Sequence, residues 1–186
     1  MKRILAISTL TASLAMAGAA AAAASSSTVG PLNVTGNVPA LCSGGTVSNN
    51  DSTFALGTLI DTSTGFMLNN LSAPNKTVTG SFCNSRSTIS VTATPLTAQA
   101  FTGTPPTGFT NALDYTATAS GWTTTAASYT TNAASNPNAT QTRSTAFTGD
   151  ITIGVSGFAP VGGAALRPVS DPSYLGVVTI TLAVAS

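Results

Sequence analysis

The chain closes on the stretch VTITLAV at residues 178–184, in which large apolar side chains alternate with small or polar ones. Successive side chains of a β-strand point to opposite faces, so this pattern predicts a strand with one apolar face. The same period of two recurs earlier, at residues 32–38, 78–82, 89–93, 113–119 and 151–155. No stretch after Ser25 keeps the apolar spacing of an amphipathic helix for three turns. The sequence therefore predicts an all-β fold.

Turn-forming residues separate these stretches. They gather at residues 43–45, 48–51, 69–70, 73–75, 104–106, 136–138, 162–163 and 171–172. Seven or more short strands separated in this way favour a β-sandwich in a single domain. A further strand, interrupted by Gly57, is expected at residues 54–59. Residues 116–148 are a run of Thr, Ala, Ser and Asn, which predicts either exposed strands or a long loop.

The composition narrows the chemistry that the chain can perform. Charged residues make up only 6%, whereas Thr (33) and Ser (22) together supply 55 of the 186 residues. The sequence contains no His and no Glu, which excludes His-dependent triads and the common zinc sites. The five Asp show no calcium-loop pattern, and an Asp pair for glycoside hydrolysis is the enzymatic alternative that stays open. We expect no enzyme activity, no cofactor and no metal site.

The first 24 residues have the pattern of a secretory signal peptide. Lys2 and Arg3 precede an apolar run that ends in an Ala tract before Ser25. A membrane anchor is the alternative, because residues 4–24 are long enough to span a bilayer. Without Lys2 and Arg3 the net charge falls from +1 to −1, with four Lys and Arg against five Asp. A nearly neutral chain without a basic stripe is not expected to bind nucleic acid.

Two cysteines, Cys42 and Cys83, follow the predicted cleavage site. Export places them in an oxidising compartment, where a disulfide is the expected state. A reactive thiol is the alternative, but the sequence offers no His and no cluster of cations to lower a thiol pKa. Closing a loop of about 40 residues would stabilise the fold by roughly 4 kcal/mol in the chain-entropy description.

Four motifs in order resemble those of bacterial pilin subunits of the chaperone-usher class, including its archaic branch and the spore-coat-U-like domains. GNVPALC at residues 36–42 is similar to the family's approach to its first-strand Cys, and FALGTL at residues 54–59 to the strand that follows. GSFC at residues 80–83 is similar to the segment with the second Cys, and YLGVVTITL at residues 174–182 to the closing strand. Residues 95–148 match nothing in the family, and the near-terminal aromatic residue of pilins is missing.

The resemblance implies an immunoglobulin-like β-sandwich that lacks its last strand, so that an apolar groove lies open beside unpaired backbone groups. In that family a periplasmic chaperone lends a strand, and during assembly the N-terminal extension of the next subunit replaces it. The expected function is a structural subunit of an extracellular fimbria or coat that supports surface adhesion. Its expected partners are the chaperone, the outer-membrane usher and like subunits in a head-to-tail polymer.

The candidate donor strand lies in an N-terminal extension at residues 25–35, followed by the sandwich domain at residues 36–186. Val29, Leu32 and Val34 are its candidate inward side chains, and burying three such residues contributes roughly 5 to 8 kcal/mol as an upper estimate. Pro31 lacks an amide hydrogen and is expected at the outer end of the donor or facing away from the ladder. In the alternative, residues 32–38 form the first strand of a complete sandwich within their own chain.

Trp122 is the single tryptophan, and it lies in polar surroundings with Tyr129 nearby. If both rings faced solvent, they would offer a stacking platform for a sugar. This gives the alternative function, a self-contained secreted β-sandwich that binds a glycan or a host surface through Trp122 and Tyr129. A Trp that fills the core or anchors a loop is the competing interpretation.

Overall fold

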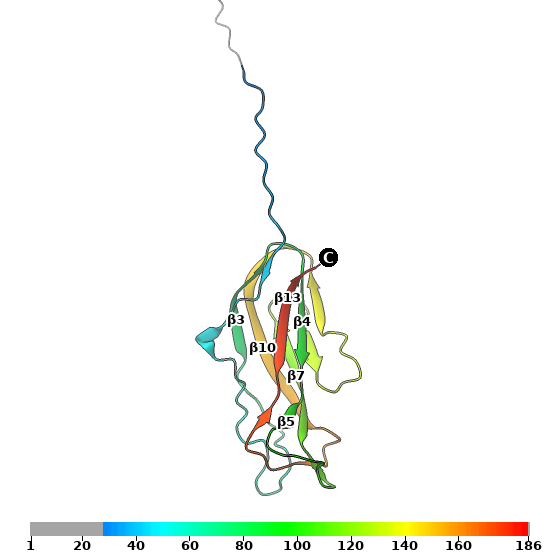
Figure 1. Cartoon of the computed structure of the whole chain (residues 1–186). Helices are drawn as coiled ribbons and strands as arrows, with labels where there is room; N and C mark the ends of the chain where they lie inside the picture. Colours follow the sequence, from blue (N-terminus) through cyan, green and yellow to red (C-terminus); the bar gives the residue numbers. More distant parts are fainter. Residues whose placement is uncertain (1–27, 186) are drawn as a thin grey trace, which may run out of the picture. The chain divides into compact units, whose positions relative to one another are not determined.

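The computed structural model describes residues 28–185 of the chain (Figure 1). The chain divides into two units, residues 1–37 and residues 38–186, which we describe separately. The predicted signal peptide at residues 1–24 and the first three residues of the predicted extension lie outside the described residues. The second unit begins two residues after the predicted domain boundary.

The second unit is built from antiparallel sheets. The larger sheet has the strand order β1-β3-β10-β7-β5-β12, with β2 beside β3 and β8 beside β7. Its strands are β1 (Cys42–Ser43), β2 (Thr46–Val47), β3 (Lys76–Cys83), β5 (Leu96–Ala98), β7 (Ala112–Ser120), β8 (Ala127–Thr130), β10 (Phe147–Pro160) and β12 (Tyr174–Leu175). Its inner strands β3, β10 and β7 are long, so this sheet forms the main wall of the domain.

The smaller sheet contains three strands, ordered β13-β4-β9: β4 (Ser87–Ala93), β9 (Thr140–Arg143) and β13 (Val178–Val184). A short parallel pair joins β6 (Phe109–Thr110) to β11 (Arg167–Pro168), and a single 3-10 turn, η1, covers Ser48–Asn50. In the part of the chain that the structure describes, no helix is long and apolar enough to cross a membrane.

The core lies between the two sheets, which gives a β-sandwich-like arrangement. Ile89 and Val91 of β4 contribute from one sheet, and Tyr115, Ala117 and Ile151 contribute from the other. The alternating sequence pattern places these side chains on the inner face, while the Thr and Ser residues between them face outward. The core is therefore made by the alternation that the sequence shows.

The two lateral sides of the sandwich differ. On one side β8 and β9 lie close, and the bonds from Ser128 N to Asn138 O (2.9 Å) and from Val91 N to Ala139 O (2.8 Å) tie the two sheets together. On the other side, β13 ends the small sheet, and no strand in the described residues joins it to the large sheet. The sandwich is closed along one side and open along the other.

Five of the six predicted alternating stretches are confirmed as strands, within β3, β4, β7, β10 and β13. The sixth, residues 32–38, belongs to no strand in the described chain. The strand predicted at residues 54–59 is wrong, since these residues pair with no strand and Gly57 takes a left-handed φ of +70°. The run at residues 116–148 combines the end of β7, the strands β8 and β9, the first two residues of β10, and the loops between them.

Candidate functional site at the free edge of β13

β13 is hydrogen-bonded along one side only. It pairs with β4 over its whole length, from Val178 opposite Ala93 to Val184 opposite Ser87. Among residues 28–185, no second strand is hydrogen-bonded to β13, although β1 comes close to it. An antiparallel strand directs its N–H and C=O groups alternately to its two sides, so part of this backbone faces away from β4 without a strand partner.

The inward side chains of β13 are also incompletely buried. Val178, Ile180 and Leu182 pack against the core but are only half-buried, whereas Ile89 and Val91 on the neighbouring strand β4 are fully buried. An inward apolar residue at a complete sandwich edge would be covered from the side by the next strand. The core is therefore uncovered next to β13.

The extended segment at residues 53–60 also carries half-buried apolar side chains. Phe54, Leu56 and Leu59 are half-buried, and Phe54 packs against the core. Lys76 of β3 holds the start of the segment, since its Nζ forms an ion pair with Asp51 and lies 5.8 Å from the centre of the Phe54 ring. The segment is thus attached at one end, while residues 54–58 belong to no sheet.

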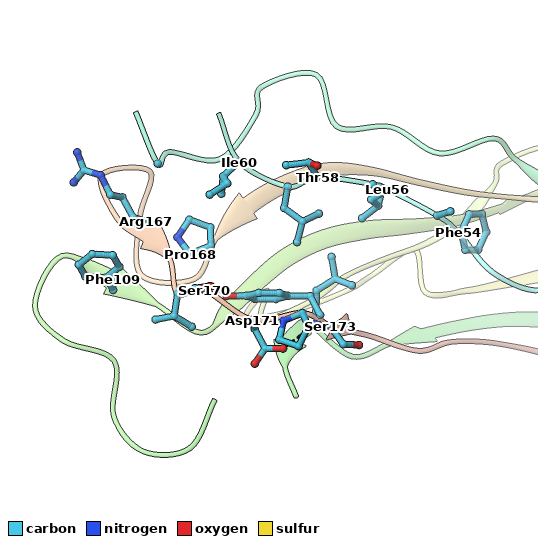
Figure 2. A pocket seen from close by; sticks show the side chains of 18 of the residues that line it. Phe54, Leu56, Thr58, Ile60, Phe109, Arg167, Pro168, Ser170, Asp171 and Ser173 are labelled. Atoms are coloured by element: carbon cyan, nitrogen blue, oxygen red, sulfur yellow. Dashed lines mark hydrogen bonds between the residues drawn. The ribbon is translucent and has the colours of Figure 1, made fainter. Parts of the chain in front are cut away.

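A cavity of about 700 Å³ lies between residues 53–60 and residues 167–174 (Figure 2). Leu96 and Phe109 complete its lining. Figure 2 shows Leu56 and Ile60 on one wall and Pro168 on the other. Its lining ends at Tyr174, four residues before β13 begins.

Two polar side chains of the lining, Asp171 and Tyr174, are hydrogen-bonded within the protein. Asp171 accepts hydrogen bonds from Phe101 N (2.7 Å), Ala100 N (2.8 Å) and Ser173 N (2.9 Å). The Tyr174 hydroxyl donates to Val169 O (2.9 Å). Because these groups are occupied in holding loops together, the cavity presents mainly apolar side chains to a ligand.

The titration of these groups follows from their surroundings. Partial desolvation acts to raise the pKa of Asp171, but the N–H groups of Ser173, Phe101 and Ala100 outweigh it and hold the pKa below its ordinary value. Desolvation raises the pKa of Tyr174, and the negative charge of Asp171 adds to this effect. Asp171 is therefore ionised and Tyr174 neutral near pH 7, which fits a structural role for both.

The arrangement offers a binding surface. Within residues 28–185, no three acidic or Cys side chains gather to hold a metal ion. The free edge of β13 offers unpaired backbone and half-buried aliphatic side chains, and the separate cavity between residues 53–60 and 167–174 offers a mainly apolar pocket. An extended polypeptide with alternating apolar side chains satisfies both features of the edge, because it pairs with an edge through its backbone and fills pockets with every second side chain.

The two cysteines lie directly opposite each other in the pairing of β1 with β3. They form the predicted disulfide between Cys42 and Cys83. The disulfide joins β1 to the end of β3, next to the end of β13, where Ala185 N donates to Arg86 O (2.9 Å). The N-terminal segment therefore joins the domain at the end where β13 finishes.

The predicted donor residues lie in the first unit, at residues 28–37. Val29, Leu32 and Val34 are 77%, 84% and 97% exposed, and this segment forms no strand. The first unit thus exposes three large aliphatic side chains within six residues.

Trp122 is fully buried, and its Nε1 donates to Ser87 Oγ (3.2 Å). Its ring meets Phe147 edge to face at 5.2 Å, and Arg143 donates to its backbone oxygen (2.7 Å). Tyr129 is half-buried against the core. A buried indole offers no face to a sugar, so the structure favours the core interpretation of Trp122 and removes the observation behind the glycan contact.

Sequence reasoning missed the wall at residues 167–174. Its only visible signal was the turn at Asp171 and Pro172, because the apolar residues there, such as Val169, follow no regular period. These residues reach the cavity through loops whose path the tertiary fold determines.

In comparisons with known proteins, no family model, curated protein or solved structure matches the chain.

Proposed function

We propose that the protein is a structural subunit of an extracellular fibre or coat, assembled when the N-terminal segment of one copy inserts along β13 of the next. The observation that carries the proposal is the free edge of β13 with its half-buried inward side chains. The resemblance to chaperone-usher pilins supports it. In this scheme the sandwich is an immunoglobulin-like fold whose missing strand comes from another chain.

The exposed segment has the chemistry of the strand that the opening lacks. Residues 28–41 carry no charge, and a period of two places Leu32, Val34 and Val38 on one face of an extended strand. Val29 then falls on the opposite face, together with Asn33 and Thr35. Leu32 and Val34 are therefore the main anchors of the proposed contact, and Val29 contributes less than the sequence pattern first indicated.

The chain directions of the N-terminal segment and of β13 support assembly into a polymer. The N-terminal segment joins its domain at the end where β13 finishes. A donor strand that lies antiparallel to β13 of another copy leaves the groove at the end where that β13 begins. Each copy then receives a strand at one end and extends its own from the other, which gives a head-to-tail chain that does not close.

Export through the periplasm fits the same proposal. An uncovered apolar edge aggregates unless it is capped, so a periplasmic chaperone that lends a strand and an outer-membrane usher that exchanges it are the proposed partners. The disulfide between Cys42 and Cys83 is the state expected for an exported domain. The proposed location is the cell surface.

Substitution of the two anchors tests the proposal. Leu32→Asn/Val34→Asn in the full chain should abolish oligomers, because polar side chains in the groove lose the burial that holds the strand. The matched control Asn33→Ser/Thr35→Ser changes the opposite face and should assemble as the wild type does. Light scattering over a concentration series measures both. Oligomers of unchanged size in the anchor variant would refute the proposal.

A further inference from the structure

Asn84 holds the three residues that precede β1. Leu41 N donates to Asn84 Oδ1 (2.7 Å), and Asn84 Nδ2 donates to Pro39 O (2.8 Å). Asn84 N donates to Leu41 O (3.0 Å). The disulfide of Cys42 fixes the next residue. We call these three hydrogen bonds the Asn84 clasp.

The proposed function requires that the N-terminal segment does not bind the groove of its own chain, and the Asn84 clasp is relevant to this requirement. A segment that is tethered to its own groove by a short link acts at an effective concentration in the millimolar range. A second copy of the chain at micromolar concentration loses that competition unless the geometry of the link forbids the intramolecular contact. A polymer of such subunits therefore needs a feature that keeps each segment out of its own groove.

The reversal must fall between the anchor Val34 and Cys42, and residues 39–41 are the part of this link that hydrogen bonds fix to the domain. The segment joins the domain where β13 ends, so it can lie along its own β13 only if the chain turns back before Cys42. A tight reversal needs backbone groups that are free to form a turn, but the clasp already uses Pro39 O and both Leu41 N and Leu41 O. Pro39 also fixes its own φ and biases Val38 to an extended conformation.

We propose that Asn84 is a positioning residue that prevents the N-terminal segment from filling its own groove, and so leaves it available to a second copy of this chain. The inference rests on the proposed function. Asn84 then decides whether the N-terminal segment enters the groove of its own chain or that of a second copy. Its side-chain amide can do this because it supplies both an acceptor and a donor to residues 39–41.

The test compares Asn84→Ala with the wild type and with Asn69→Ala, a control at an exposed turn residue. The probe is a labelled synthetic peptide of residues 25–38, added to full-length protein at concentrations below those at which the wild type oligomerises. The wild type and Asn69→Ala should bind it equally. Asn84→Ala should bind it at least about tenfold more weakly and stay monomeric where the wild type assembles, because its own segment now competes.

A second variant distinguishes competition by the chain's own N-terminal segment from damage to the groove. Adding Leu32→Asn/Val34→Asn to Asn84→Ala disables the competing segment, so peptide binding should return to the level of Leu32→Asn/Val34→Asn alone. Failure to recover would mean that Asn84→Ala damages the groove, and equal binding by Asn84→Ala and the wild type would mean that the clasp has no directing role. Either result overturns the inference. If Leu32→Asn/Val34→Asn itself binds no peptide, the proposed function fails instead.

Discussion

Trp122 is fully buried, and its Nε1 has Ser87 as partner. Trp122→Ala should lower the free energy of unfolding by about 3 to 5 kcal/mol, because it removes a large buried side chain and leaves a cavity. Urea unfolding followed by circular dichroism measures this. Tyr129→Phe, the control on a half-buried ring, should change the same quantity by about 0.5 kcal/mol or less. A loss below about 1 kcal/mol in Trp122→Ala would contradict the placement of the ring.

The acidic residues determine how stability depends on pH. The pKa of Asp51, Asp61 and Asp171 lies below 3.8: the hydrogen bond from Lys76 lowers it at Asp51, and that from Ser63 lowers it at Asp61. At Asp171 backbone N–H groups outweigh partial desolvation. A folded-state pKa below the unfolded value means stability that is present above pH 3.8 and lost as the pH falls through the folded-state pKa.

Because the sequence has no His, the melting temperature should be constant between about pH 5 and 8 and fall below about pH 4. Asp171→Asn should reduce the acid-induced fall, since one of the three groups no longer titrates. Thermal scans across this pH range measure both effects. A melting temperature that rises on acidification below pH 4 would contradict the argument.

Among the elements, the long strands could be predicted and the short ones could not. β4, β7 and β13 have an alternating sequence because the side chains of one face pack toward the core and those of the other face point outward. The two-residue strands β6, β11 and β12 depend on neighbours brought together by the fold, which no local pattern records. Residues 54–59 have a strand-like pattern but no partner strand in the described chain, so the pattern predicted their side-chain burial and misjudged their pairing.

The disulfide is the covalent link between β1 and β3, and it encloses a chain separation of 41 residues. Replacing both cysteines, as Cys42→Ser/Cys83→Ser, should lower the free energy of unfolding by about 4 kcal/mol, mainly because the unfolded chain gains freedom. Urea unfolding of the oxidised protein and of the double variant gives the difference. A loss of less than about 1 kcal/mol would show that β1 is held by other contacts.

At the scale of the whole molecule, the proposed function depends on the difference between the two lateral sides of the sandwich. β8 and β9 tie the sheets together on one side, whereas β13 leaves the other side open. The sequence alone left two interpretations of residues 32–38 open, because alternation reveals that a strand has an apolar face but not which chain it pairs with. The structure adds that β13 pairs with β4 alone among the described residues, and the pairing of residues 32–38 with another chain stays a prediction.

Hydrogen–deuterium exchange of the β13 amides tests the open edge most directly. The sample is full-length Leu32→Asn/Val34→Asn, whose own segment is disabled, with and without the peptide of residues 25–38. We expect the β13 amides that bond to β4 to be protected in both samples, and the alternate amides to exchange quickly until the peptide protects them. Protection of all β13 amides without the peptide, or no change on adding it, would contradict the account.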